Sequence, residues 1–146
     1  MKYTHIVWDF NGTLLDDVTI GIETVNTLLE KRKLKTLSCA DEYRDVFCFP
    51  VKEYYARIGF DFETESYDAL AVEWMEQYLS RAHRAPLYSG AADVLDILGA
   101  TGAQQIILSA SELRILKEQL KSLDIDRYFS LILGLDDIYA HSKTML

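Results

Sequence analysis

The feature that most constrains the fold is the stretch Thr4–Asp17, in which a short apolar run leads directly into an acidic turn. The run Ile6–Trp8 is typical of a strand buried on both faces of a parallel sheet. It ends in Asp9, and Asn11-Gly12 follows, a pair suited to a tight turn with positive φ. A carboxylate at the carboxyl end of a central strand lies where open α/β sheets bind ligands. The alternative is a surface turn in which the acid caps the next segment, and that leaves the buried run before it unexplained.

Later segments repeat the pattern of a parallel α/β sheet. Apolar residues at helical spacing predict a helix over Ala91–Ala100, and the run Gln105–Leu108 predicts a second strand. That strand ends in Ser109, and Ser111 is suited to capping the helix that follows. A third strand is predicted over Ser130–Gly134. Strands that alternate with helices in this way predict an α/β fold.

Between the first two strands the sequence is helical instead. Apolar residues recur at helical spacing in Val18–Lys33, in Val51–Ile58 and most clearly in Tyr67–Leu79. The intervening residues 38–49 have a mixed pattern that predicts no element. We expect Trp74 to pack inside this helical region and not on the second strand.

Composition excludes several classes of function. The chain has 146 residues, of which 49% are hydrophobic and 26% charged, the balance of one globular domain with a real core. Its net charge of −8 argues against binding to nucleic acid or to an anionic membrane. Cys39 and Cys48 have no metal or redox spacing and predict reduced thiols in a cytoplasmic protein. The first apolar run contains His5 and Asp9, so it predicts neither a signal peptide nor a membrane span.

The stretch Asp9–Thr13, with the sequence D-F-N-G-T, resembles the first motif of the haloacid dehalogenase superfamily of phosphohydrolases, D-x-D-x-T. Ser109, at the end of the second strand, is similar to the hydroxyl residue of the second motif. Lys143, after the third strand, lies where the lysine of the third motif is expected. The motifs follow one another in the family's order.

The resemblance covers nearly the whole chain and implies its architecture. The expected fold is α/β, a three-layer Rossmann-like parallel sheet with an inserted α-helical cap domain. Residues 1–16 and 85–146 would form the core, incomplete at its C-terminus, and residues 17–84 would form the cap. Such a cap resembles that of the phosphoglycolate phosphatase-like branch, in which it closes over the active site and helps to select the substrate.

The resemblance also implies a chemistry, a cofactor and a class of substrate. Asp9 would be the nucleophile that forms an aspartyl-phosphate, and Asn11 stands at the position of the general acid/base. Gly12, Ser109 and Lys143 would hold the phosphoryl group, and Lys143 would also keep the nucleophile ionised. Mg²⁺ would be held by Asp9 and Asn11. The expected partner is a small phosphorylated metabolite.

Departures from the family's motifs leave alternatives open. Asn11 replaces an Asp that would transfer a proton, and Thr144 follows Lys143 where the family usually has proline. The fourth motif, which supplies further acidic metal ligands, is not found after Lys143. These departures favour, as an alternative, a catalytically impaired or truncated phosphate-binding module. A phosphoaspartate receiver, with Asp9 phosphorylated by a partner, is a third hypothesis, and the long helical insertion argues against it.

The missing fourth motif leads to an expectation about the first strand. In this superfamily the first strand is central, with the strand of the fourth motif on one side of it. Without that strand, Ile6–Trp8 would be an exposed sheet edge, which invites pairing. We therefore expect either a longer parent protein or self-association through this edge. The first is favoured because it also explains the missing metal ligands, and it predicts weak Mg²⁺ binding and slow hydrolysis.

Overall fold

The computed structural model describes residues 3–139, and these divide into two compact units. The sheet unit contains residues 3–16 and 86–137, and the helical unit contains residues 17–85 and 138–139. Lys143, which the sequence assigns to the phosphate site, lies outside the described residues. In the part of the chain that is described, no helix has the length and apolar character needed to cross a bilayer.

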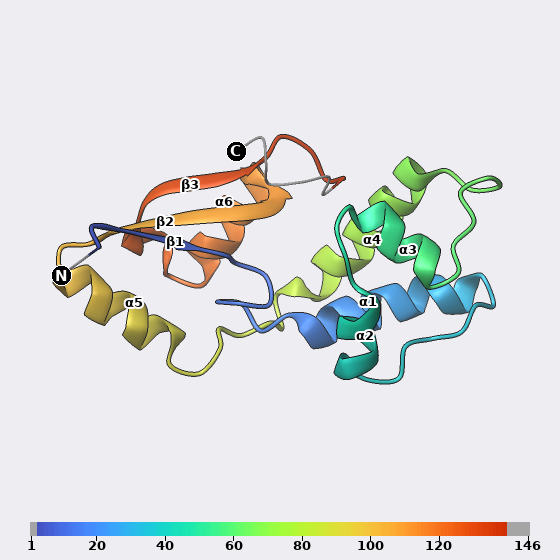
Figure 1. The fold of residues 1–146 in the computed structure, drawn as a ribbon, viewed down its shortest axis with the longest axis horizontal. Coiled ribbons are helices and arrows are strands. Elements are labelled where there is room, and N and C mark those ends of the chain that lie inside the picture. The colour runs from blue at the N-terminus through green and yellow to red at the C-terminus, as the bar shows by residue number, and fades with distance from the viewer. Residues whose placement is uncertain (1–2, 140–146) are drawn as a thin grey trace. The chain divides into compact units, whose positions relative to one another are not determined.

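Three parallel strands form the centre of the sheet unit, in the order β1-β2-β3 (Figure 1). The strands are β1 (His5–Trp8), β2 (Gln104–Glu112) and β3 (Phe129–Leu135). Helix α5 (Ala91–Ala100) leads into β2, and α6 (Leu113–Ser122) with the short 3-10 helix η1 (Asp126–Tyr128) leads from β2 to β3. This arrangement confirms the predicted α/β fold with a parallel sheet.

One face of the sheet is closed by packing and side-chain hydrogen bonds. Gln105, Ile107 and Ser109 alternate along β2 and are buried on this face. The Gln105 side chain donates to the carbonyl oxygen of Leu95 in α5 at 2.9 Å and accepts from the Trp8 indole of β1 at 3.0 Å. One buried amide therefore joins α5, β1 and β2.

The opposite face is open in the described residues. Val7 of β1, Ile106 of β2 and Leu131 of β3 are aligned across the ladder, so their side chains share this face. Val7 is 59% exposed and Leu131 47% exposed. The prediction that Ile6–Trp8 is buried on both faces is therefore wrong for Val7. The predicted open edge is confirmed for residues 3–139, in which β1 has a paired strand on one side only.

The carboxyl end of β2 differs from the prediction. We expected the strand to end at Leu108, but it continues to Glu112, with irregular pairing before Glu112 meets Leu135 of β3. A Cβ atom at Gly134 would lie 2.8 Å from the Ser111 carbonyl oxygen, so the two backbones approach closely only because residue 134 is glycine. The cap of α6 is also different: the Glu112 carboxylate, and not Ser111, accepts the first free N–H groups of the helix.

The helical unit contains four helices in its described residues: α1 (Val18–Lys31), α2 (Ala40–Val46), α3 (Val51–Arg57) and α4 (Tyr67–Ala82). Sequence periodicity predicted α1, α3 and α4 to within a few residues. It missed α2 because this helix has no buried residue, and therefore no apolar stripe of helical period.

The core of the helical unit is closed and rich in aromatic side chains. It contains residues of α1, α3 and α4 that are almost fully buried, among them Leu28, Tyr55 and Leu70, and Trp74 packs against it as predicted. Burial raises the pKa of the Tyr55 phenol well above its ordinary value. A buried hydrogen bond also joins the start of α1 to α4. The carboxylate of Asp17, the residue before α1, accepts it from the Tyr78 hydroxyl of α4 at 2.8 Å.

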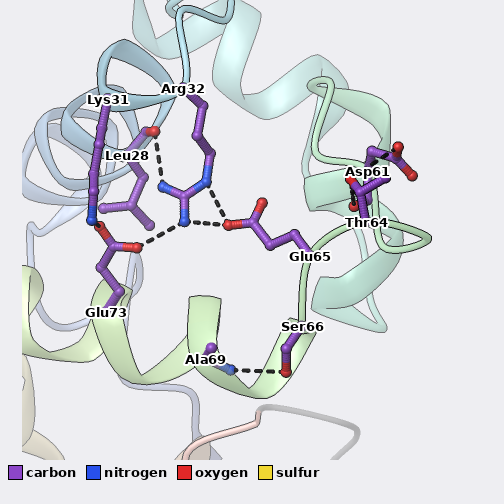
Figure 2. A network of polar contacts seen from close by, with 9 residues as sticks. All are labelled: Leu28, Lys31, Arg32, Asp61, Thr64, Glu65, Ser66, Ala69 and Glu73. Atoms are coloured by element: carbon purple, nitrogen blue, oxygen red, sulfur yellow. Dashed lines mark hydrogen bonds and ion pairs between the residues drawn. The ribbon is translucent and has the colours of Figure 1, made fainter.

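A network of charged side chains joins the C-terminal end of α1 to α4. Figure 2 shows the Arg32 guanidinium between two carboxylates, with Nε donating to Glu65 at 2.6 Å and Nη2 to Glu73 at 2.8 Å. Its Nη1 donates to the carbonyl oxygen of Leu28 at 3.1 Å. Lys31 also pairs with Glu73 at 2.7 Å. The arginine thus links the end of α1 to α4 and to the segment before α4.

Candidate active site

The turn after β1 is a rigid element anchored by a buried side chain. Phe10 is fully buried, and its carbonyl oxygen accepts from the N–H groups of Thr13, Leu14 and Leu15 at 2.9–3.2 Å. Gly12 has φ +69°, as the Asn-Gly pair predicted. Its N–H donates to the carbonyl oxygen of Leu15 at 2.9 Å. Gly12 therefore supplies the backbone conformation of the turn, and its assignment to the phosphate site stays a prediction.

Asp9 begins this turn, one residue beyond the end of β1. Its Oδ2 accepts a hydrogen bond of 3.2 Å from the Thr13 hydroxyl. The sequence matched Thr13 to the motif threonine without giving it a role, and the structure gives it a contact with the proposed nucleophile. A hydroxyl four residues later reaches back to the carboxylate because the intervening turn is tight, and this contact fixes one carboxylate oxygen.

Asn11 is joined to the end of β2 by a chain of hydroxyl groups. The Ser109 hydroxyl donates to Ser111 Oγ at 3.1 Å, and the Ser111 hydroxyl donates to Asn11 Oδ1 at 2.8 Å. Ser109 is almost fully buried and also accepts from the Ser111 N–H at 3.1 Å. Ser111, which the sequence suited to a helix cap, is therefore the residue that bridges the two loops. Its only sequence signal was a second hydroxyl two residues after Ser109.

These contacts bring predicted site residues from two strands together. Asn11 and Ser109 are joined through Ser111, at the carboxyl ends of β1 and β2, and Asp9, two residues before Asn11 in the same turn, is bonded separately to Thr13. Ligands of open α/β sheets bind at such strand ends. Together these described residues offer a carboxylate, an amide oxygen and hydroxyl groups.

The oxygen atoms of Asp9 and Asn11 are of the type that binds a hard divalent cation, but they make up only part of a coordination shell. Carboxylate and amide oxygens are suitable ligands for Mg²⁺, which keeps several waters and needs few protein ligands. Asn11 Oδ1 already accepts one hydrogen bond and has a second lone pair. Within residues 3–139, no group of three or more His, Cys, Asp or Glu side chains is arranged to hold a metal ion. Asp9 and Asn11, which the resemblance assigns to Mg²⁺, carry oxygens of this type.

A shallow groove of about 450 Å³ lies beside the ends of β2 and β3. It is lined by Glu112, Leu113, Arg114, Lys117, Glu118, Leu135 and Asp136. Arg114 pairs with both Glu112 and Glu118, so its charge is matched within the groove. The groove does not include Asp9 or either serine, and we do not assign it to the site.

Comparison with known proteins decides the family. The sequence model described as haloacid dehalogenase-like hydrolase matches residues 6–145, nearly the whole chain. The chain belongs to this family. The family predicted from the Asp9–Thr13 motif is thereby confirmed. No curated protein sequence matches the chain at a significant level.

Solved structures share the fold of this haloacid dehalogenase-like chain at low sequence identity. A predicted phosphoglycolate phosphatase from Haemophilus somnus has a TM-score of 0.71 at 18% identity, with 94% of this chain and 66% of that chain covered. A haloacid dehalogenase-like hydrolase from Streptococcus pneumoniae has 0.74 at 19% identity, covering 91% and 61%. Protein tyrosine kinase A from Mycobacterium tuberculosis has 0.79 at 18% identity, covering 92% and 61%. The chain therefore spans roughly two thirds of the length of these structures.

Proposed function

We propose that this haloacid dehalogenase-like chain is a phosphohydrolase that cleaves a small phosphate monoester, with Asp9 as the nucleophile. The observation that carries the proposal is the position of Asp9 at the carboxyl end of β1, in a turn that fixes its carboxylate through Thr13. Family membership supports the reaction class, and the net charge of −8 supports a small-molecule substrate over nucleic acid.

In this mechanism an Asp9 oxygen attacks phosphorus, the ester oxygen leaves, and the aspartyl-phosphate that forms is hydrolysed by water. Ser109 and Lys143 would hold the phosphoryl oxygens and stabilise the charge that develops on them. Asp9 and Asn11 would hold Mg²⁺, which neutralises phosphate charge when bound. Asn11 cannot donate a proton to the leaving group. The proposal therefore favours substrates with good leaving groups, because a general acid contributes about 10²–10⁴-fold.

In this proposal residues 17–84, which form most of the helical unit, act as a cap that helps to select the substrate. Its closed core supports this role, because a lid must keep its own structure while it moves. A cytoplasmic location is part of the proposal and is supported by the two free cysteines, Cys39 and Cys48.

A phosphate-binding module without turnover is the second candidate. It is favoured by Asn11, which lacks an acidic proton and already accepts the Ser111 hydroxyl. It is also favoured by the absence of a third acidic ligand near Asp9 within residues 3–139.

A turnover assay with an aryl phosphate and Mg²⁺ distinguishes the two candidates. We expect slow hydrolysis that is lost in Asp9→Asn and kept in Asp93→Asn, which removes an exposed carboxylate of the same unit. Hydrolysis that survives Asp9→Asn would contradict the proposal. No hydrolysis, together with binding of inorganic phosphate that Asp9→Asn alters, would support the binding module instead.

A further inference from the structure

Ser111 lies at the candidate site, and the proposed function gives it no role. Its backbone is held from two sides. The N–H of Ser111 donates to Ser109 Oγ at 3.1 Å, and Ser109 is almost fully buried. The carbonyl oxygen of Ser111 lies so close to β3 that a Cβ atom at Gly134 would be 2.8 Å from it. A hydroxyl on a backbone fixed in this way can hold a neighbouring side chain in one orientation.

The Ser111 hydroxyl holds one particular end of the Asn11 amide. The Ser109 hydroxyl donates to Ser111 Oγ, and the Ser111 hydroxyl donates in turn to Asn11 Oδ1. The distance of 2.8 Å between Ser111 Oγ and Asn11 Oδ1 is typical of an O–H···O hydrogen bond. An amide oxygen only accepts, and an amide nitrogen only donates. Asn11 is therefore held by its oxygen, and its NH₂ group is turned away from the Ser111 hydroxyl.

The turn after β1 presents Asn11 and Asp9 on the same side. Phe10, which lies between them, is fully buried, whereas Asp9 and Asn11 are both half-buried. The two polar side chains therefore lie on the outer side of the turn. A phosphate ester that Asp9 attacks must come within reach of residue 11 as well.

We propose that the Asn11 amide donates an N–H hydrogen bond to an oxygen of this phosphate ester, and that Ser111 is the positioning residue that orients the amide. The inference rests on the proposed reaction at Asp9. Phosphoryl transfer is catalysed mainly by positioning and by stabilising charge on the phosphoryl oxygens. A donor that is oriented beforehand stabilises this charge without reorganising during the reaction. Asn11 would thus contribute to the reaction without transferring a proton.

The bond that orients Asn11 does not use the proton of Ser109. When Ser109 turns its hydroxyl to a phosphoryl oxygen, as the proposed function requires, Ser111 keeps its own proton on Asn11 Oδ1. The N–H of Ser111 also stays on Ser109 Oγ. Ser109 and Asn11 can therefore donate to the same phosphoryl group at the same time.

Turnover of an aryl phosphate in a double-mutant cycle tests whether Ser111 acts through Asn11. We expect Asn11→Ala to lower kcat/KM by about 10²-fold or more, as the loss of a positioned donor does. Ser111→Ala should lower it by about tenfold, and by nothing further in the Asn11→Ala background. Ser111→Thr keeps the hydroxyl and should retain most of the turnover.

Ser130→Ala is the matched control for this cycle. It removes a hydroxyl that donates to the Gln105 carbonyl oxygen at 3.2 Å, at the opposite end of the sheet. We expect it to leave turnover unchanged. Circular dichroism confirms that each variant is folded.

The side-chain amide signals of Asn11 in ¹⁵N–¹H correlation spectra test the contact itself, without turnover. The signals are identified by their loss in Asn11→Asp. Inorganic phosphate, added with Mg²⁺ already present, should shift them in the parent chain and in Ser111→Thr, and much less in Ser111→Ala. The side-chain amide of Asn26, which donates to the Leu37 carbonyl oxygen in the helical unit, should not move.

Two results would overturn the inference and leave the proposed phosphate site standing. One is an equal loss of turnover from Ser111→Ala with and without Asn11, because Ser111 would then act on another group. The other is phosphate that shifts the backbone amide of Ser109 but not the side chain of Asn11. A chain that neither hydrolyses the ester nor binds phosphate would overturn the proposed function and this inference with it.

Discussion

The helical unit and the sheet unit differ in how completely they bury their apolar residues. In the helical unit, Leu28 and Leu70 are fully buried in an aromatic core, and ion pairs join the C-terminal end of α1 to α4 (Figure 2). In the sheet unit, Val7 and Leu131 remain exposed on one face of the sheet. The helical unit therefore has a closed core of its own, whereas the sheet unit, which carries the proposed site residues, has an uncovered face and edge among its described residues. Substitutions in the helical core should therefore change mainly the free energy of unfolding. Substitutions at the proposed site in the sheet unit should change mainly the turnover.

The largest effect is expected on chemistry, from Asn11→Asp in the sheet unit. An acid at this position can protonate the leaving group, so turnover of alkyl phosphates should rise by up to about 10²–10⁴-fold. Aryl phosphates need less protonation and should gain less. Steady-state kinetics on both substrate classes measures the effect, and equal gains would show that residue 11 is not at the acid/base position. The free energy of unfolding should change little, because residue 11 lies in the sheet unit and outside the helical core.

A matched pair of leucines tests the comparison on the side of stability. Leu70→Ala in the helical core should cost about 2–5 kcal/mol, because it leaves a cavity in a fully buried site. Leu131→Ala on the open sheet face should cost less than about 1 kcal/mol, since this side chain is 47% exposed. Urea unfolding is followed separately in each unit with single-tryptophan variants, since Trp74→Phe leaves Trp8 to report on the sheet unit and Trp8→Phe leaves Trp74 to report on the helical unit. Equal costs would refute the comparison.

The sequence predicted the parts of the fold and of the candidate site that depend on neighbouring residues, and it missed those that depend on residues far apart in the chain. The turn at Asp9–Gly12 was predicted correctly because its conformation is set by neighbouring residues. The extent of β2 was not, because Glu112 is held in the sheet by pairing with Leu135 of β3. The role of Ser111 depends on Asn11, which lies 100 positions earlier. The proposed roles of the site residues remain predictions, and Lys143 lies outside the described residues.

A smaller effect is expected from Tyr78→Phe, which tests the tie between α1 and α4. The change removes the hydroxyl that donates to the buried Asp17 carboxylate and keeps the ring, which stacks on Trp74 with centroids 4.8 Å apart. Loss of the donor should cost about 1–3 kcal/mol, because the carboxylate is left with one partner fewer in a buried position. Urea unfolding measures the cost. An unchanged midpoint would mean that water replaces the tyrosine hydroxyl and that the helical unit is open to solvent at this point.

The smallest effect is expected from pH. Burial raises the pKa of Glu73, but hydrogen bonds from Arg32 and Lys31 outweigh it, and the net pKa is lowered. A carboxyl group whose pKa is lowered in the folded state stabilises the protein at pH values above its unfolded pKa, which is about 4.3 for Glu. This stabilisation is lost as the pH falls through the pKa of the folded state. Because the network is partly exposed, we expect less than about 1 kcal/mol.

Unfolding measured between neutral and acidic pH tests this prediction. Glu73→Gln should remove part of the acid sensitivity of the helical unit. Glu76→Gln, a neighbouring exposed position on α4, serves as the control and should not. An acid sensitivity that is unchanged in Glu73→Gln would mean that the Arg32 network contributes nothing measurable to the closure of this unit.

Trapping the covalent intermediate tests whether the sheet unit performs phosphoryl transfer through Asp9. The chain is mixed with an aryl phosphate and Mg²⁺, quenched in acid, digested and mapped by mass spectrometry. We expect a phosphoryl group on Asp9, which is absent in Asp9→Asn and retained in Asp93→Asn. Turnover with no phosphoryl group on Asp9, or with the label on Ser109 or Ser111 instead, would contradict it.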